Sequence, residues 1–378
     1  MTENLANTDL LWAKTAEETR KALDAGADVN YTTWTDETPL MRAKTAEQTK
    51  LLIAAGANVN AKDKYGQTAL MKAETAEQTK LLIAAGADVN ARDEHGQTAL
   101  MKAETAEQMK LLIAAGADVN AEDEDGDTAL IYAQDIYAKL IGQRLSPIER
   151  TKILKEQTKL SIEKTKVLIA AGANVNAKGY DNETALMCAP TAELTKLLID
   201  AGADVNAKDV FGETALMKAL TAEETKLLIA AGADINVRSE YYHYTALICA
   251  HTVEQAKLLI DAGADVETGD FKIVEDVYER RGRRGDYEQV EAVRELIKQQ
   301  EKMKTEKKKI QREKNDETKQ RLKSKPRDKK LSGVVFADAI AKMKLSGEIK
   351  GDVTPDRAKK IITKMMRDRV LSERNAKK

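Results

Sequence analysis

The chain has 378 residues, and its formal net charge is −1. This near-neutral sum conceals an asymmetry, because residues 298–378 carry a net charge of +15 and residues 1–297 carry −16. No apolar run approaches the ~18–20 residues that span a bilayer, and the first residues lack the basic and apolar stretches of a secretory signal. With a third of its residues charged and only 5 prolines, the sequence is typical of a soluble helical protein rather than a β-sandwich.

Cysteine and histidine usage argues against disulfide and metal chemistry. The two cysteines, Cys188 and Cys249, are too few for a disulfide framework, and they have no metal-ligand spacing with the three histidines. No phosphate-binding Gly-rich loop, H-E-x-x-H or G-x-S-x-G motif occurs. We therefore expect a non-enzymatic protein without cofactor or metal, and the free thiols favour a reducing, cytoplasmic compartment.

An internal repeat dominates the chain from its first residues to about residue 297. The segment G-A-D/N recurs with its glycine at residues 26, 56, 86, 116, 172, 202, 232 and 263. The period is 30, interrupted by one 26-residue insertion between 116 and 172 and by one extra residue between 232 and 263. Two successive units, 61–90 and 91–120, match at 26 of 30 positions. A fixed period of this length indicates a solenoid, in which each unit buries its apolar face against its neighbours.

Each unit contains signals for a turn and two helices, which unit 61–90 illustrates. The D-x-x-G segment at 63–66 is a turn signal, and the T-A-L-M-K-A segment at 68–73 predicts a short first helix. The T-x-x-Q pattern that begins at Thr75 is a capping box that opens a second helix. Gly86 then ends this helix in the left-handed conformation.

The unit resembles an ankyrin repeat, because it combines D-x-x-G-x-T-A-L-x-x-A with K-L-L-I-x-A-G-A-D-V-N-A. The resemblance covers roughly residues 8–297. It implies an all-α dominated repeat solenoid of about nine helix-turn-helix pairs with β-hairpin loops over residues 1–297, the ninth pair being divergent (about 270–297). The units are shorter than the usual ~33 residues, and T-A-L-M replaces the family's T-P-L-H.

The fifth unit carries an insertion near residues 135–160. Its first helix is expected to continue through Ile136, Tyr137, Leu140 and Ile141. The S-P-I-E segment at 146–149 predicts a second helix start with proline at the first helical position. Both helices are therefore expected to be lengthened into a protruding helical hairpin. The insertion is compatible with a tolerated surface extension and with a partner-specific contact.

The tail after residue 297 changes composition. Residues 298–330 hold 15 Lys and Arg and few apolar residues, which predicts either a solvated helix or a disordered linker. Residues 331–378 regain apolar periodicity and predict a small basic helical hairpin. The densest basic runs are the expected anion-binding residues Lys307, Lys308, Lys309, Lys323, Lys325, Arg327, Lys329 and Lys330.

Two rows of varying positions are the candidate partner-binding residues of the solenoid. The first row is at the hairpin tips, where exposed aromatic side chains are typical of binding hot spots: Trp34, Tyr65, Tyr180, Phe211, Tyr241 and Tyr242. The second row follows the A-L-M segment, a position that the ankyrin resemblance places on the concave face: Arg42, Lys72, Lys102, Tyr132 and Lys218. Aromatic tips that only cover neighbouring hairpins, and lysines that are only solvated, remain open alternatives.

Two functions of different classes fit these features. The first is a protein–protein interaction scaffold that binds a partner protein through the concave face and the hairpin tips. The second is a nucleic-acid or anionic-surface adaptor that works through the basic tail, whose binding would weaken strongly with salt. A tail that folds back on the acidic solenoid and a host-directed secreted effector are also compatible with the sequence.

Overall fold

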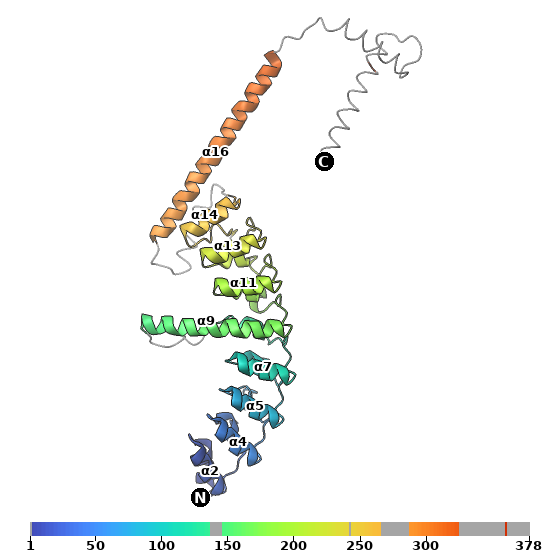
Figure 1. Cartoon of the computed structure of the whole chain (residues 1–378), viewed down its shortest axis with the longest axis vertical. Helices are drawn as coiled ribbons and strands as arrows, with labels where there is room; N and C mark the ends of the chain where they lie inside the picture. Colours follow the sequence, from blue (N-terminus) through green and yellow to red (C-terminus); the bar gives the residue numbers. More distant parts are fainter. Residues whose placement is uncertain (1, 137–145, 242, 266–286, 325–359, 361–378) are drawn as a thin grey trace, which may run out of the picture. The chain divides into compact units, whose positions relative to one another are not determined.

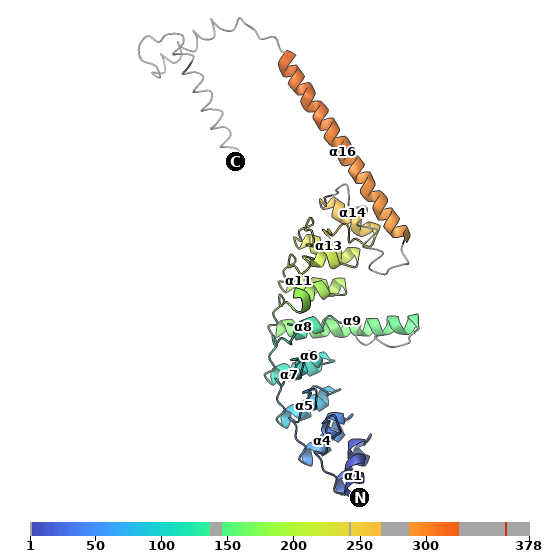
Figure 2. The same cartoon turned by 180° about the vertical axis from the view of Figure 1, so that it is seen from behind.

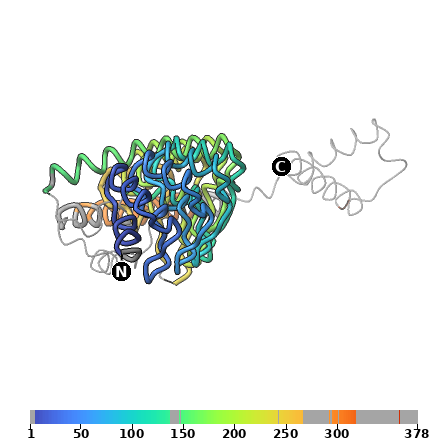
Figure 3. The backbone as a smooth tube through the Cα atoms, turned by 90° about the horizontal axis from the view of Figure 1, so that it is seen from below, coloured from blue at the N-terminus to red at the C-terminus, as the bar shows by residue number. Residues whose placement is uncertain are grey.

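The computed structural model describes residues 2–136, 146–241, 243–265, 287–324 and 360. The chain divides into two compact units, Met1–Met303 and Lys304–Lys378. The first unit contains the repeats, whose helices stack side by side (Figure 1). Viewed end-on, the repeats superpose along this stack (Figure 3).

Most repeats pair a first helix with a second helix of nine residues. The first helices are α1 (Thr2–Leu11), α3 (Pro39–Arg42), α6 (Ala99–Lys102), α8 (Ala129–Tyr132), α10 (Ala185–Cys188) and α12 (Ala215–Lys218). The second helices are α2 (Ala16–Asp24), α4 (Ala46–Ala54), α5 (Ala76–Ala84), α7 (Ala106–Ala114), α11 (Ala192–Asp200), α13 (Ala222–Ala230) and α14 (Val253–Asp261). The fifth unit has the longer α9 (Pro147–Ala170) as its second helix.

The first helix is not formed in every unit. Residues 69–72 and 246–249 are turns, so the helix predicted over 68–73 is wrong. The amide of Lys72 bonds to the carbonyl of Ala69, whereas Lys102 bonds to Thr98 in the α-helical i→i−4 pattern. One helical turn has a single such bond, so a small shift decides between helix and turn.

The predicted capping box is confirmed, and its glutamine also ties neighbouring repeats together. In α5 the Thr75 hydroxyl accepts from the Gln78 amide, and Gln78 Oε1 accepts from the Thr75 amide, both at 3.2 Å. Gln78 is 2% exposed, and its Nε2 donates to the carbonyl of Ala43 in the preceding unit at 2.8 Å. The same inter-repeat bond recurs at Gln48, Gln108 and Gln255.

An asparagine ladder, formed by the last Asn of each G-A-D/N-V/I-N segment, joins successive loops. Asn60 Oδ1 accepts from the Asp88 amide at 2.8 Å, and Asn60 Nδ2 donates to the Gly86 carbonyl at 3.0 Å. Both bonds cross from one unit to the next. The pattern repeats at Asn30, Asn90, Asn120, Asn176, Asn206 and Asn236.

The core is a continuous row of leucines between the second helices. One leucine from each of these helices after α2 is at most 2% exposed: Leu52, Leu82, Leu112, Leu168, Leu198, Leu228 and Leu259. Full burial of such a side chain contributes about 1.5–3 kcal/mol. Because each leucine contacts neighbouring repeats, this stabilisation belongs to the stack and not to a single unit.

Among the described residues, the insertion lengthens the second helix of the fifth unit and not the first. Helix α9 starts at Pro147 behind the Ser146 cap and runs for 24 residues, so that it extends past the other second helices (Figures 1, 2 and 3). Helix α8 ends at Tyr132, and residues 133–136 are not helical, so the predicted continuation through Ile136 is wrong. Gln134 Nε2 bonds to Leu130 O and Thr165 Oγ1, which turns the chain onto α9. The rest of the predicted first arm (137–145) lies outside the described residues.

The hairpin loops are turns rather than β-hairpins. In the described ranges the only β pairing is an isolated bridge between Glu122 and Thr128, and no strand is present. Asp63 accepts from two backbone amides with one carboxylate oxygen, and its own amide bonds to the carbonyl of Gln67. The side chain thereby closes the loop within five residues. Asp123 makes the same bonds, and the loop that it closes is the one flanked by the bridge.

Helix α16 (Tyr287–Ser324) begins in the first unit and continues through the change of composition at residue 297. Ile297 is 1% exposed and belongs to the solenoid core, whereas residues 302–317 are exposed. The helix therefore continues across residue 297, and residues 298–324 are helical, which agrees with the solvated-helix alternative of the prediction. The predicted hairpin at 331–378 and most of the divergent ninth unit lie outside the described residues. None of the described helices has the length and apolarity to span a bilayer.

Candidate functional site

We call the second row of candidate residues, which follows the A-L-M segment, the concave row. Its lysines form ion pairs with buried aspartates of the hairpin loops. Lys72 Nζ is 2.8 Å from Asp63 Oδ2, and Lys102 Nζ is 3.0 Å from Asp93 Oδ2. Lys218 is likewise 2.8 Å from the buried Asp209. The aspartate side chains are at most 1% exposed and the lysines 19–23%. Each aspartate shapes its loop with one oxygen, and the lysine neutralises the other.

A second carboxylate completes two of these pairs. Glu37 Oε1 is 2.6 Å from Lys72 Nζ, and Glu183 pairs with Lys218 in the same way across one repeat. Burial lowers the pKa of Lys72, but the bonds to Asp63 and Glu37 outweigh it, so the pKa is raised. The bond from Lys72 is the main reason that the pKa of Glu37 is lowered, against an opposing effect of burial. Both groups are therefore charged at neutral pH.

In the other units, the residue type in the row changes with the residue type in the loop. The loop residue lies nine positions earlier, or ten in the eighth unit. Where the row has Tyr132, its hydroxyl donates to Asp123 Oδ2 at 2.7 Å and takes the place of the lysine. The sixth unit has a glycine in place of the aspartate and Cys188 in place of the lysine. The eighth unit combines Ser239 with Cys249. The residue in the row thus varies with the loop residue that it contacts. This variation is not by itself a sign of ligand binding.

Arg42 begins the row and contacts an aromatic ring. Its guanidinium lies over the Trp12 ring at 4.1 Å, and its Nε donates to the Leu11 carbonyl at 3.2 Å. Its Nη1 also pairs with Glu37 at 2.9 Å. Trp12 is 59% exposed, so the ring retains an accessible surface beside the arginine.

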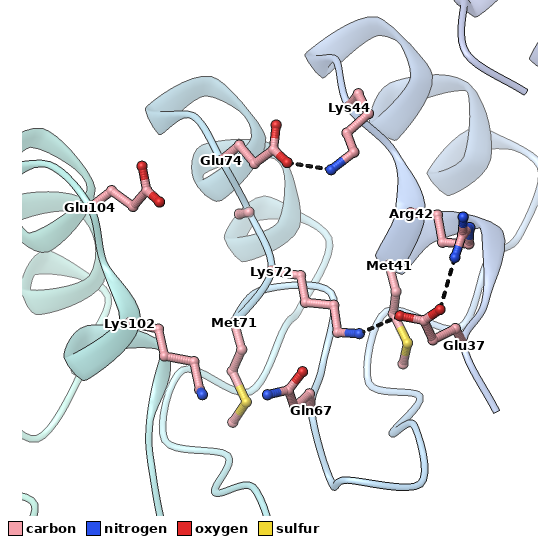
Figure 4. Close-up of a pocket in the computed structure, with 11 residues that line it drawn as sticks. Glu37, Met41, Arg42, Lys44, Gln67, Met71, Lys72, Glu74, Lys102 and Glu104 are labelled. Carbon is pink, nitrogen blue, oxygen red and sulfur yellow. Dashed lines mark hydrogen bonds and ion pairs between the residues drawn. The ribbon is translucent and has the colours of Figure 1, made fainter. Parts of the chain in front are cut away.

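A hollow of about 470 Å³ opens along this row between units two and four (Figure 4). The side chains around it carry both signs of charge, and Lys44 pairs with Glu74 across it. Two buried methionines also line it. Its four cations are all engaged with carboxylates of the same protein. The lining residues are Glu37, Met41, Arg42, Lys44, Gln67, Met71, Lys72, Ala73, Glu74, Lys102 and Glu104.

The hairpin tips form a second surface, which is held together by backbone bonds between repeats. The Lys64 amide bonds to the Thr35 carbonyl at 3.0 Å, and the Glu94 amide bonds to the Tyr65 carbonyl at 2.9 Å. Equivalent backbone bonds are made by Glu124, Val210 and Glu240, whereas the Tyr180 amide bonds to the Asp127 side chain. This surface, the tip face, has a first row of Trp34, Lys64, Glu94, Glu124, Tyr180, Val210 and Glu240, and a second row of Thr35, Tyr65, His95, Asp125, Asp181, Phe211 and Tyr241.

Aromatic residues cluster at the N-terminal end of the tip face. Lys64 Nζ lies 4.3 Å from the Trp34 ring centroid and 4.9 Å from that of Tyr65. Trp34 is 87% exposed and Tyr65 is 49% exposed. We call these three residues the N-terminal tip group. It shows that the tips hold an ammonium group between two rings of successive repeats, an attractive cation–π arrangement.

A second aromatic cluster, the C-terminal tip group, consists of Tyr180, Val210, Phe211 and Tyr241. The rings of Phe211 and Tyr241 pack edge to face with centroids 6.1 Å apart. Tyr180 and Tyr241 are 61% and 70% exposed, and the other two are about 40% exposed. The predicted tip residue Tyr242 lies outside the described residues. Contiguous exposed apolar side chains of this kind mark interaction sites.

The basic residues of the tail are only partly described. Lys307, Lys308 and Lys309 are exposed on α16, and Lys323 lies near the end of the same helix. The remaining expected anion-binding residues lie outside the described ranges: Lys325, Arg327, Lys329 and Lys330.

Neither cysteine is placed for chemistry. Burial, with the nearby Glu183 carboxylate, raises the pKa of the Cys188 thiol to about 12, and Cys249 is 3% exposed. A protonated thiol is a poor nucleophile and a poor metal ligand. Within the residues that the structure describes, no three His, Cys, Asp or Glu side chains are grouped to hold a metal ion.

Comparison with known proteins identifies the repeat. A family model described as ankyrin repeats (3 copies) matches residues 12–93, 74–140 and 190–270, more than half of the chain. Among solved structures, the ankyrin repeat domain of Bcl-3, of the IkappaB protein family, is 26% identical with a TM-score of 0.43, over 59% of this chain and 97% of that one. The human ASB11 ankyrin repeat domain is 21% identical with a TM-score of 0.48, over 62% and 98%. No curated protein sequence matches. By its repeats and by the family match, the chain belongs to the ankyrin repeat family.

Proposed function

We propose that this chain is a non-enzymatic scaffold that binds a partner protein through its tip face, with the concave row as a neighbouring contact surface. Ankyrin repeats generally act as protein–protein interaction modules, which makes this class of function the starting point. The observation that carries the proposal is the exposure of Trp34, Tyr180 and Tyr241, each at least 60%. Tyr and Trp are enriched at binding hot spots, and an exposed ring gains most when a partner covers it.

The concave row has a smaller part in this proposal than the sequence predicted. The ammonium groups of Lys72, Lys102 and Lys218 are bonded to buried aspartates, so a partner would have to break an ion pair to use them. Trp12 and Arg42 are the members of this surface with an accessible aromatic and cationic face. We therefore assign most of the binding energy to the tips.

Affinity capture with the full-length chain tests the proposal. We expect proteins captured from a lysate of the source cells to include partners that are lost with Trp34→Ala and Tyr241→Ala. The matched control is Ile148→Ala on α9, which removes an equally exposed apolar side chain, 83% exposed, outside the tips. A capture profile that is the same for wild type and both tip variants would contradict tip-face binding.

A second candidate function is binding of nucleic acid or another anionic surface through α16. The observation that favours it is the run of exposed residues 302–317, in which Lys307, Lys308 and Lys309 are adjacent on a solvated helix. Phosphate neutralisation predicts that the logarithm of affinity falls linearly with the logarithm of salt concentration, with a slope of about −0.9 per phosphate contact on duplex DNA. Replacing the three lysines by glutamine in the full chain should reduce that slope by about two to three. An unchanged slope, or no binding at low salt, would exclude this function for α16.

A further inference from the structure

The two aromatic clusters of the tip face occupy matching positions of two successive tips: an aromatic residue in the first row, then a first-row residue and an aromatic second-row residue of the next tip. The inter-repeat backbone bonds align Trp34 with Tyr180 and Tyr65 with Phe211, because Lys64 bonds to Thr35 as Val210 bonds to Asp181. Val210 therefore occupies the position of Lys64. The N-terminal tip group holds its own ammonium between two rings, whereas the C-terminal tip group has an aliphatic side chain, 40% exposed, at the position of that lysine.

The surface between the two groups is acidic. Glu94, Glu124 and Asp125 are exposed at the intervening tips, and none of them has an ion-pair partner among the described residues. We call this stretch of the tip face the acidic centre. Residues 1–297 as a whole carry a net charge of −16. Such a potential attracts cationic partners and disfavours anionic ones by like-charge repulsion.

We propose that the C-terminal tip group receives a lysine or arginine side chain from a separate partner protein, in the place that Lys64 fills in the N-terminal tip group. The proposal deepens the proposed function, on which it rests, by naming the chemistry of the partner: a basic segment with apolar neighbours. Tyr180 and Phe211 contact the cation and its alkyl stem, and Tyr241 extends the apolar contact. Further basic residues of the segment lie along the acidic centre.

The separation of the groups sets the length of this segment. Three repeat steps separate Tyr65 from Asp181, the neighbour of Tyr180, and neighbouring helices pack about 8–10 Å apart, so the acidic centre extends over about 25–30 Å. An extended peptide covers about 3.3 Å per residue, so roughly eight or nine residues reach from one group to the other. A 16-residue peptide can therefore contact one aromatic group and the whole acidic centre.

A displayed library of random 16-residue peptides, selected on the full-length chain, tests the inference. We expect the selected peptides to be enriched in lysine and arginine and to lose at least tenfold in affinity with Tyr180→Ala. The decisive variant is Val210→Lys, which supplies the cation from within, as Lys64 does, and should also weaken binding at least tenfold. Val210→Leu is the matched control, and it should stay within threefold of wild type.

The outcomes separate this inference from the proposed function. Selected peptides that lack basic residues, or that bind Val210→Lys and Tyr180→Ala as tightly as wild type, overturn the inference. The scaffold function is tested separately, by affinity capture. A library that yields no binder also overturns it. Peptides that match residues 304–324 of this chain would identify a second copy as the occupant and exclude a separate partner. If Val210→Lys unfolds, two other variants test the inference: Tyr180→Ala, and the double variant Glu124→Gln with Asp125→Asn. The double variant should weaken peptide binding and reduce the salt dependence of the affinity.

Discussion

The Asp127 carboxylate lies directly against the backbone of Gly179, across the junction between the fifth and sixth units. A Cβ atom on residue 179 would come within 1.8 Å of Asp127 Oδ1 and 2.9 Å of the Ile131 Cδ1. The same carboxylate oxygen accepts from the Tyr180 amide at 3.0 Å, in place of the backbone bond that joins the other tips. The glycine is therefore required by the close approach of its neighbour, and the junction carries Tyr180 into the tip face.

We expect Gly179→Ala to destabilise the chain by about 1–3 kcal/mol, because the added methyl group must displace the Asp127 side chain from its bond to Tyr180. Thermal and denaturant unfolding of the full chain measures the loss. The same substitution in an Asp127→Ala background should cost less, since the clash is then largely removed. Equal costs in both backgrounds would show that the contact is not the cause.

We expect Asp127→Asn to stabilise the chain at neutral pH. Burial is the main cause that raises the pKa of Asp127, and the nearby Asp123, Asp125 and Glu183 add to it against the opposing bond from Tyr180. A carboxyl with a raised folded-state pKa favours the fold below its unfolded pKa, and this contribution is lost as pH rises through the folded pKa. The free energies of unfolding of wild type and Asp127→Asn should thus differ most at pH 7 and become equal below pH 4. A constant difference across this range would contradict the assignment.

The buried pair of Asp93 and Lys102 gives the opposite pH dependence. Burial raises the pKa of Asp93, but bonds from Lys102 and from the amides of Gln97 and His95 outweigh it, so the pKa is lowered. The pair then stabilises the fold above the unfolded pKa of about 4, and the stabilisation is lost as pH falls through the folded pKa. Lys102→Met should cost about 1–3 kcal/mol at pH 7, because it leaves a carboxylate that is 1% exposed without its cation.

The matched control for this pair is Lys102→Met with Asp93→Asn. The asparagine oxygen still accepts from the loop amides, and no buried charge remains, so most of the lost stability should return. Unfolding at pH 7 and pH 3 compares the three proteins. A double variant as unstable as Lys102→Met would show that the ion pair is not what the lysine contributes.

Glu224 takes the place of the inter-repeat glutamine in α13 and lacks its donor. The side chain is 2% exposed, Oε2 caps the helix, and Oε1 is buried without a hydrogen-bond partner. Glu224→Gln restores an NH₂ group like that of Gln78, which bonds to the preceding unit. We expect a gain of about 1 kcal/mol, and a loss of similar size or more for the reverse change Gln78→Glu. Denaturant midpoints measure both, and a destabilised Glu224→Gln protein would contradict this account.

The repeat period and the caps made most of the fold predictable, because each unit repeats the same local signals. The capping boxes and the α9 start at Pro147 follow from side chains that bond within one turn. The predicted β-hairpins were wrong for the described loops. Side-chain bonds such as those of Asp63 close each loop, but the only β pairing beside these loops is the bridge of Glu122 and Thr128, and the residue pattern does not specify how far pairing continues. The continuation of α8 failed because Gln134 bonds to residues of α9, which are distant in sequence.

The candidate site was predicted in part. Exposed rings at the tips follow from turn positions, but the contact of Lys64 with Trp34 and Tyr65 depends on how three tips align, which one unit does not encode. The aspartate partners of the concave lysines were missed, although a signal exists. In each aspartate–lysine pair the lysine follows the aspartate by nine residues, as in Asp63 with Lys72. The lysine is absent from the units in which the aspartate is absent.

The asparagine ladder bridges the insertion without a change of pattern. The Asn174 amide bonds to Asn120 Oδ1 at 2.7 Å, although 54 residues separate them, and Asn120 Nδ2 bonds to Gly172 O at 3.3 Å. The fifth unit thus presents the same hydrogen-bonding edge to its neighbours as a unit of ordinary length. The arm formed by α9 is mechanically independent of the spacing of the stack, so its length can change while every other repeat keeps its register. This makes the fifth unit a natural graft point, where an added segment leaves the two aromatic groups of the tips at a constant separation.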